Sequence, residues 1–121
     1  MVSAMKATGS QRPSVDPRDL EIARAFARAF AAHCHPSAFE VRLFGSRARG
    51  EGDEESDLDL FVTLQEDDPH RHLREAALQI ACDLTLEHGL LVSVLVADPT
   101  FLKRCHGYSF LEAVAHEGIR V

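Results

Sequence analysis

The alternation of apolar and polar residues along the chain predicts a series of helices and strands from residue 16 onward. Asp16 and Pro17 are typical of a helix start, and apolar residues then recur at helical spacing as far as Phe30. Between residues 39 and 43 the period changes to two, which predicts a strand. A loop with three glycines follows, and the run DLDLFVTL at residues 57–64 predicts a second strand.

The next helix expected has an apolar residue at every third or fourth position. Residues 67–69 (Asp-Asp-Pro) are typical of its start, and Gly89 stands where a helix commonly ends. Cys82 lies near the apolar stripe, so we expect its thiol to be buried as a small hydrophobic group. The residues of the stripe are Leu73, Ala77, Ile80 and Leu84.

A third strand and a last helix complete the predicted order of elements. Residues 90–97 (LLVSVLVA) are almost wholly apolar, which favours a central strand covered on both faces. Asp98 and Pro99 predict a short helical turn, and a final helix runs from Ser109 to Gly118. The resulting order indicates an α+β (mixed α/β) domain, with a small mixed β-sheet flanked by helices.

Length and composition restrict the organisation of the chain. Its 121 residues suffice for a single domain, which we place at residues 16–121 after a flexible polar tail at residues 1–15. No apolar run approaches the ~20 residues that span a bilayer, and the first residues do not resemble a secretory signal. Because an odd number of three cysteines fits reduced thiols, we expect a cytoplasmic protein without a membrane segment.

Charge is distributed unevenly along the chain, whose net charge is −6. Residues 1–50 carry eight basic and four acidic side chains, whereas residues 51–121 carry five basic and fifteen acidic ones. An acidic chain is a poor general binder of nucleic acid, so direct DNA binding is not expected. The abrupt change of sign between Arg49 and Glu51 suits a site that handles both anions and cations, although a solvated loop explains it equally simply.

Two aspartates in the second predicted strand are candidate metal ligands. Asp57 and Asp59 are two residues apart, so their side chains share one face, with Cα atoms roughly 6.5 Å apart. Leu58 and Leu60 then face the core. Carboxylates at this spacing can converge on hard divalent cations and leave positions open for phosphate oxygens. The alternative is an acidic, solvated turn with two carboxylates at an edge.

The loop between the first two strands contains a candidate phosphate-binding turn. Gly45 allows the backbone to approach an anion closely, and the amides of a helical turn after Ser46 would point toward it. A P-loop is excluded because Glu51 stands where that motif requires lysine. An EF-hand beginning at Asp53 is excluded because its sixth residue would be Leu58 instead of glycine.

The segment LFGSRARG followed by SDLDLFV resembles the signature of the DNA polymerase β-type nucleotidyltransferase superfamily, and the short chain looks most like its minimal nucleotidyltransferases. The resemblance implies a nucleotidyltransferase fold, with Gly45 and Ser46 holding the triphosphate of ATP or another NTP. It also implies that Asp57 and Asp59 ligate Mg²⁺, in a two-metal site. The expected reaction transfers NMP, AMP in the case of ATP, to an acceptor hydroxyl with release of pyrophosphate.

Two arginines follow the Gly-Ser pair. Arg47 and Arg49 are candidates for compensating the negative charge of the triphosphate. Phosphoryl transfer depends mostly on positioning and on charge stabilisation, which is the contribution that these residue types can make.

One feature departs from the family pattern. Full members usually carry a third carboxylate on the neighbouring strand, but residues 90–97 contain no acid, and Ser93 is the polar residue that would occupy its place. Asp98 follows the strand and is better explained as a helix cap. Loss of a general base typically lowers a rate by 10²–10⁴-fold. An active enzyme would therefore need another base, either His70 or His72 reaching the site or a group on the acceptor.

Two functional hypotheses follow from the resemblance. Minimal nucleotidyltransferases are often paired with HEPN-domain proteins in toxin–antitoxin systems, which implies an antitoxin that neutralises a HEPN-type toxin, in some cases by adding AMP to it. The chain is therefore expected to be an active transferase with a partner-presented acceptor or, alternatively, a weak or inactive module that works by binding its partner. A purely structural protein is the third hypothesis, and homo-oligomerisation is left open.

Overall fold

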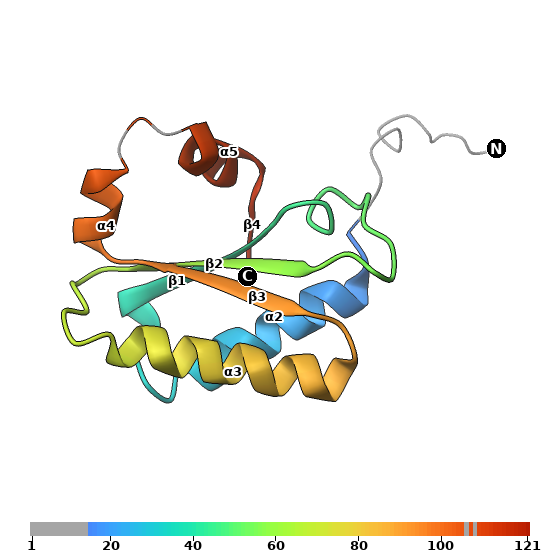
Figure 1. Cartoon of the computed structure of the whole chain (residues 1–121), viewed down its shortest axis with the longest axis horizontal. Helices are drawn as coiled ribbons and strands as arrows, with labels where there is room; N and C mark the ends of the chain where they lie inside the picture. Colours follow the sequence, from blue (N-terminus) through green and yellow to red (C-terminus); the bar gives the residue numbers. More distant parts are fainter. Residues whose placement is uncertain (1–14, 106, 108) are drawn as a thin grey trace.

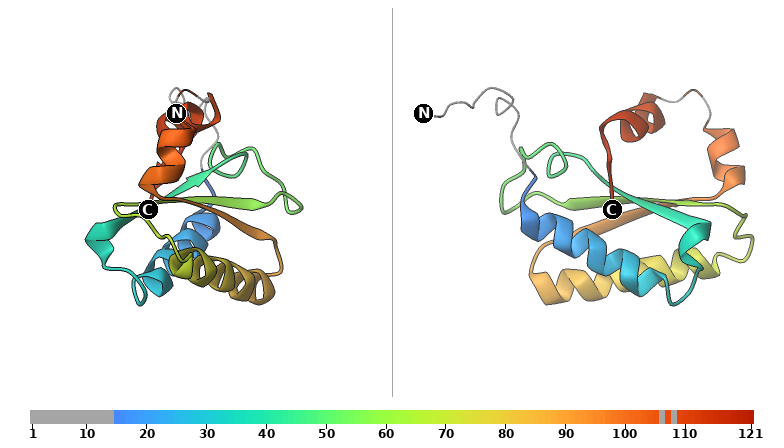
Figure 2. Two further views of the ribbon diagram at one scale, coloured as in Figure 1. Left: turned by 60° about the vertical axis from the view of Figure 1, so that its left-hand side comes forward. Right: turned by 180° about the vertical axis from the view of Figure 1, so that it is seen from behind.

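The computed structural model describes residues 15–121 with the exception of residues 106 and 108. The predicted tail therefore lies outside the described residues, apart from Val15. The elements follow the order α2 (Pro17–Phe30), η2 (Pro36–Ala38), β1 (Phe39–Phe44), β2 (Leu58–Leu64), α3 (His72–His88), β3 (Val92–Ala97), α4 (Pro99–Arg104), α5 (Ser109–Glu117) and β4 (Ile119–Arg120). Figure 1 shows α2 and α3 beneath the sheet and α4 and α5 above it, and Figure 2 shows the same layers from two other sides.

The sheet is mixed, as the sequence predicts. In the described part of the chain its strand order is β3-β2-β1-β4. Strand β1 is antiparallel to both β2 and β4, whereas β2 is parallel to β3. The register places Asp59 between Phe44 of β1 and Ser93 of β3. The short strand β4 was not predicted, because two residues are too few to show an alternating pattern.

Strict alternation along the strands separates the two faces of the sheet. Leu58, Leu60 and Val62 of β2 are fully buried and belong to the main core, which α2 and α3 complete. The intervening residues Asp59 and Phe61 face the opposite side. There, Phe61 is part of a smaller apolar cluster beneath α4 and α5. The charged half of the Asp-x-Asp pattern is thus directed away from the main core.

Strand β3 lies at an edge of the sheet, so the prediction of a central strand is wrong, although apolar clusters cover both of its faces as predicted. Its inner residue Val92 packs into the main core, but Ser93 is exposed. The apolar composition of residues 90–97 reflects contacts with helices on two sides rather than a second neighbouring strand. The edge position leaves the surroundings of Ser93 open to solvent.

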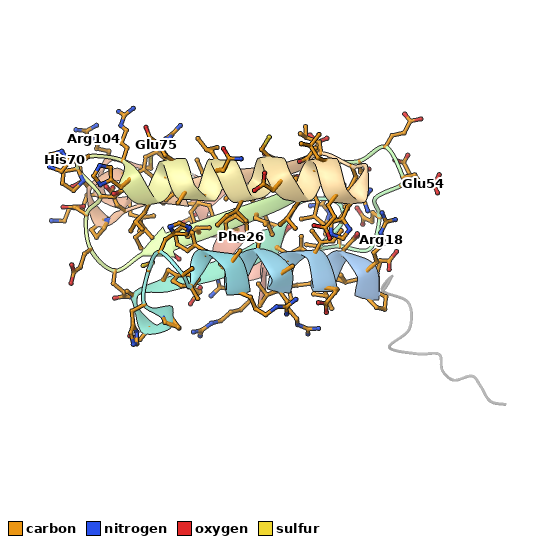
Figure 3. The ribbon with its side chains drawn as sticks, turned by 90° about the horizontal axis from the view of Figure 1, so that it is seen from below. Arg18, Phe26, Glu54, His70, Glu75 and Arg104 are labelled. Carbon is orange, nitrogen blue, oxygen red and sulfur yellow. The ribbon has the colours of Figure 1, made fainter. Side chains whose placement is uncertain are left out.

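Helix α2 begins as predicted. The Asp16 carboxylate accepts a hydrogen bond from the N–H of Arg18 at 2.9 Å, and Pro17 occupies the first helical position. The row formed by Ile22, Phe26 and Phe30 is buried at intervals of four residues. Figure 3 shows Phe26 between α2 and α3, where the two helices pack against each other.

Helix α3 begins at His72, three residues later than the end of the predicted Asp-Asp-Pro start. Asp68 nevertheless caps this helix from outside it, because its carboxylate accepts the N–H groups of Leu73 and Arg74. The helix ends at Gly89, which has the expected left-handed backbone. Cys82 is exposed, so its predicted burial is wrong; Ala81 occupies the adjacent buried position. No helix among the described residues is long and apolar enough to cross a membrane.

Candidate active site

The two candidate carboxylates lie at the beginning of β2. The strand starts at Leu58, so Asp57 precedes it and is exposed, whereas Asp59 lies within the strand and is half-buried. Burial raises the pKa of the Asp59 carboxyl above its ordinary value, and the nearby charge of Asp57 raises it further. Because the two charges repel, the pair is electrostatically unsatisfied. Among the described residues, no salt bridge involves either carboxylate.

Gly45 brings the turn after β1 close to the Asp59 carboxylate. Its φ angle is +82°, a conformation that favours glycine. A Cβ atom at this position would lie 2.6 Å from the Oδ2 atom of Asp59, which is closer than van der Waals contact allows. The sequence therefore needs glycine here for two reasons, the backbone conformation and the close approach of a carboxylate.

A helical turn follows Gly45, as predicted. The N–H of Ala48 donates to the carbonyl oxygen of Gly45 at 3.1 Å, and the N–H of Gly50 donates to that of Arg47 at the same distance. Ser46 opens this turn and is half-buried. The structure thus brings Gly45 and Ser46 to the end of the sheet where Asp57 and Asp59 lie.

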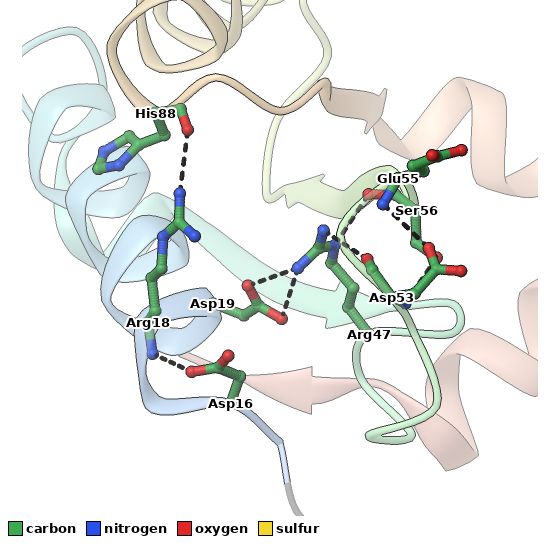
Figure 4. Close-up of polar contacts among 8 residues, drawn as sticks. All are labelled: Asp16, Arg18, Asp19, Arg47, Asp53, Glu55, Ser56 and His88. Carbon is green, nitrogen blue, oxygen red and sulfur yellow. Dashed lines mark hydrogen bonds and ion pairs between the residues drawn. The ribbon is translucent and has the colours of Figure 1, made fainter.

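Arg47 is held by protein groups on three sides. Its Nη1 atom donates to both carboxylate oxygens of Asp19, at 2.9 and 3.2 Å, and only 8% and 4% of the two side chains is exposed. Its Nε and Nη2 atoms donate to the carbonyl oxygens of Ser56 and Asp53. Figure 4 shows this arrangement, in which Arg47 ties α2 to the loop that leads into Asp57. The observed geometry gives Arg47 a positioning role, while its contact with a nucleotide stays a prediction.

Asp19 is a residue that the sequence analysis missed. It lies on the same side of α2 as Ile22, Phe26 and Phe30, where an acidic residue would be costly without a partner. An acid on the apolar side of a predicted helix was therefore the available signal. It required an equally buried cation elsewhere, and Arg47 is that cation.

Arg49 differs from Arg47 because almost half of its side chain is exposed. Its guanidinium forms ion pairs with Glu51 at 3.0 Å and with Glu117 of α5 at 3.8 Å. Since exposed ion pairs contribute little to stability, a phosphate group can compete for Arg49 more readily than for Arg47. Binding of a nucleotide by Arg49 remains a prediction.

Ser93 lies directly beside Asp59 in the parallel register of β2 and β3. Residues at matching positions in neighbouring strands share a face, so the hydroxyl of Ser93 shares the face of Asp59 as expected. In the described part of the chain, no group of three or more His, Cys, Asp or Glu side chains is arranged to hold a metal ion. The position next to Asp59 thus carries a hydroxyl instead of a third carboxylate.

The other groups considered for this role lie at the opposite end of the sheet. Asp98 follows the C-terminal end of β3 and accepts the N–H of Phe101 at 2.9 Å, which confirms it as a helix cap. His70 and His72 come after the C-terminal end of β2, so the strand, roughly 20 Å long, separates them from Asp57. Figure 3 shows His70 and Glu54, which belongs to the loop before Asp57, at opposite ends of the molecule. Of the two alternatives considered for the base, the structure therefore does not support a histidine that reaches over, and a group on the acceptor stays a prediction.

The donor set fits a divalent cation. Two carboxylates in mutual repulsion provide hard oxygen ligands, and the absence of a described cationic partner leaves both available. A carboxylate pair beside a Gly-Ser turn is the arrangement that the resemblance to nucleotidyltransferases predicts.

The comparison with known proteins agrees with this class. Residues 27–107 match the family described as "Nucleotidyltransferase domain", and the chain belongs to this family. The chain is also 30% identical over 102 residues to a protein of Methanocaldococcus jannaschii named "Putative protein adenylyltransferase". The alignment covers 84% of this chain and 97% of that relative. The resemblance to minimal nucleotidyltransferases is thereby confirmed, and with it a chemistry of NMP transfer.

Proposed function

We propose that this nucleotidyltransferase transfers AMP from ATP to a hydroxyl group of a protein, with Asp57 and Asp59 as its metal-binding carboxylates. The observation that carries the proposal is the contact between Gly45 and the Asp59 carboxylate. It supports a single site, made of the turn proposed to bind phosphate and the carboxylates proposed to bind metal. The name of the relative from Methanocaldococcus jannaschii supports both the adenylyl group and the protein acceptor.

The turn at Gly45 and Ser46 is proposed to hold the triphosphate. Glycine exposes the backbone to close approach by phosphate oxygens, and the first N–H groups of the turn after it would be the donors to the phosphate. Arg49 would add a positive charge beside the turn, because its present ion pairs are exposed and weak. Arg47 would keep the loop at residues 53–56 in place, and with it Asp57.

Asp57 and Asp59 would bind two Mg²⁺ ions together with the phosphates. Bound in this position, the ions supply positive charge to the attacking and leaving oxygens. The carboxylates themselves must be ionised to bind metal; burial, and then the charge of Asp57, raise the pKa of Asp59, and a bound cation would oppose both effects. We therefore expect binding of metal and of ATP to reinforce each other.

The transfer itself forms one bond and breaks one. The acceptor oxygen forms a bond to the α-phosphorus while the bond from that phosphorus to the oxygen bridging the β-phosphorus breaks. Pyrophosphate leaves with the electron pair, and the hydroxyl proton passes to a base. Ser93 cannot serve as that base at neutral pH, because a serine hydroxyl is not ionised there. The proton acceptor would be a group on the partner or a water molecule.

The serine at position 93 favours a second candidate function. A site without the third carboxylate suits a module that binds a protein partner and modifies it slowly or not at all. In this case the chain acts as an antitoxin that neutralises a HEPN-type toxin by binding. Both candidates place the protein in the cytoplasm, where ATP is available and thiols such as that of the free Cys34 stay reduced.

The test is a transfer assay with ATP labelled at the α-phosphate, Mg²⁺ and a HEPN-type protein as acceptor. The expected result is covalent label on the acceptor together with pyrophosphate release, both lost in the Asp57→Asn/Asp59→Asn variant. Ser93→Asp should raise the rate about tenfold or more, because it restores a carboxylate beside Asp59. Inhibition of the toxin without labelling, by both the wild type and Ser93→Asp, would favour the binding module. Absence of both labelling and ATP binding would reject the transferase.

A further inference from the structure

An aromatic cluster flanks the candidate active site on the same face of the sheet. Phe44 immediately precedes Gly45 and is paired with Asp59 across the antiparallel strands. Phe61 follows Asp59 by two residues, so its side chain projects from the same face. The two rings meet edge to face with their centroids 6.3 Å apart. Asp59 therefore lies directly beside two aromatic rings.

Phe110 of α5 completes this cluster from above the sheet. Its ring packs edge to face against Phe44, at a centroid distance of 5.7 Å, and against Phe61, at 6.5 Å. Yet 46% of Phe110 remains exposed. The exposed large hydrophobic side chains among the described residues are Phe110, Leu78, Leu86 and Leu91, and of these Phe110 alone is aromatic.

We propose that Phe110 is the platform on which the nucleobase of the bound NTP stacks. This inference rests on the proposed function, which places the reacting phosphate at Asp57 and Asp59. The base is covalently attached to that phosphate through the ribose, so it must lie within one nucleotide's reach of the carboxylates. Phe110 is 46% exposed there, and its ring packs against the buried Phe61 and the partly buried Phe44.

This arrangement has a consequence for specificity. The rings of Phe44, Phe61 and Phe110 carry no hydrogen-bonding group, so the cluster recognises the flat face of a base and not its edge. A purine covers more of an aromatic ring than a pyrimidine does. We therefore expect ATP and GTP to bind more tightly than CTP and UTP, with this difference depending on Phe110.

The experiment is titration calorimetry of the whole chain with ATP and with inorganic tripolyphosphate, both in Mg²⁺. Phe110→Leu keeps an apolar side chain against Phe44 and Phe61 but removes the ring. It should weaken ATP binding about five- to one-hundred-fold, the effect of losing one base–aromatic contact, and leave tripolyphosphate binding unchanged. Phe110→Tyr should retain ATP binding. Leu86→Ala, at an exposed position on α3, should leave the binding of both ligands unchanged.

The outcomes separate this inference from the proposed function. If the wild type binds ATP and Phe110→Leu binds it equally well, the stacking role is overturned and the proposed function stands. Equal weakening of ATP and tripolyphosphate would show that Phe110 only supports the fold, and thermal unfolding of the variant checks this directly. If the wild type binds neither ligand, the proposed function fails and the inference fails with it.

Discussion

Aspartates at the two ends of β2 and β3 have opposite surroundings. At the far end, the Asp68 carboxylate accepts the N–H groups of Leu73 and Arg74, and the Asp98 carboxylate accepts those of Phe101 and Asp68. The hydrogen bonds from the N–H groups of Phe101 and Asp68 lower the pKa of Asp98, and the bond from Phe101 has the largest effect. At the near end, burial and the charge of Asp57 raise the pKa of Asp59.

The difference distinguishes structural from functional carboxylates of the same residue type. At the far end, the carboxylates of Asp68 and Asp98 accept hydrogen bonds from backbone N–H groups at the starts of α3 and α4. The negative charge of these carboxylates therefore stabilises the fold. At the near end, two charges are held together although they repel each other. A fold that maintains such repulsion is expected to use the pair for an external cation.

Asp19 should show the largest effect on stability. In Asp19→Ala, the guanidinium of Arg47 stays buried without its partner, and we expect a loss of about 3–5 kcal/mol in the free energy of unfolding. Chemical denaturation measures this directly. Addition of Arg47→Met should restore part of the loss, since no unpaired charge then remains buried. A loss below about 1 kcal/mol for Asp19→Ala would contradict a structural role for this pair.

Gly45→Ala should damage both stability and function. The positive φ angle alone costs roughly 1–2 kcal/mol for a residue with a Cβ atom, and the collision with the Asp59 carboxylate adds to it. Metal-dependent ATP binding should fall at the same time, because both halves of the site are displaced. In a background of Asp59→Ala the same change should cost less. An equal cost in both backgrounds would show that the carboxylate does not contact Gly45.

Asp98→Ala should have a smaller effect, confined to stability. It removes the cap of α4 and the hydrogen bond from the N–H of Asp68, which predicts a loss of about 1 kcal/mol. ATP binding should be unchanged because Asp98 lies at the far end of the sheet. Thermal unfolding and calorimetry on the same sample distinguish this outcome from a role of Asp98 as a metal ligand, in which ATP binding would fall.

Asp59→Asn should have the smallest effect on stability, and its sign should be opposite. Without metal at pH 7, removal of one of two like charges should raise the free energy of unfolding by ~0.5 kcal/mol. Because the folded-state pKa of Asp59 is raised, the wild type gains stability as pH falls through that pKa and this carboxyl takes up its proton. The advantage of the variant should therefore shrink as the pH is lowered from 7. An advantage that is constant with pH would exclude the repulsion as its cause.

Much of the fold follows from local patterns in the sequence. The caps at Asp16 and Asp98 and the end of α3 at Gly89 depend on nearby backbone groups, so short-range rules predict them. The place of β3 at an edge depends on strand pairing over long distances, which the composition of residues 90–97 does not reveal. Helix α3 starts later than the Asp-Asp-Pro pattern predicts, because the Asp68 carboxylate accepts the N–H of Leu73 across an intervening turn.

The candidate site was predictable where its chemistry lies in one continuous segment. Gly45 and Asp59 are close in the sequence, and alternation along a strand is enough to place Asp59 on the face away from the core. The buried pair of Asp19 and Arg47 joins residues 28 positions apart, so the sequence analysis did not find this ion pair, while nucleotide binding by Arg47 stays a prediction. The place of Phe110 beside the site likewise depends on the packing of α5 against β1 and β2, which local sequence patterns do not predict.

The most direct test of the contrast between the two ends makes the same chemical change at each. Asp57→Asn/Asp59→Asn and Asp68→Asn/Asp98→Asn are compared with the wild type by calorimetry with ATP and Mg²⁺ and by thermal unfolding. We predict that the first pair loses metal-dependent ATP binding and keeps or gains stability, while the second loses stability and keeps binding. Retention of metal-dependent ATP binding by the first pair, with a large fall in its stability, would contradict the assignment of Asp57 and Asp59 to the active site.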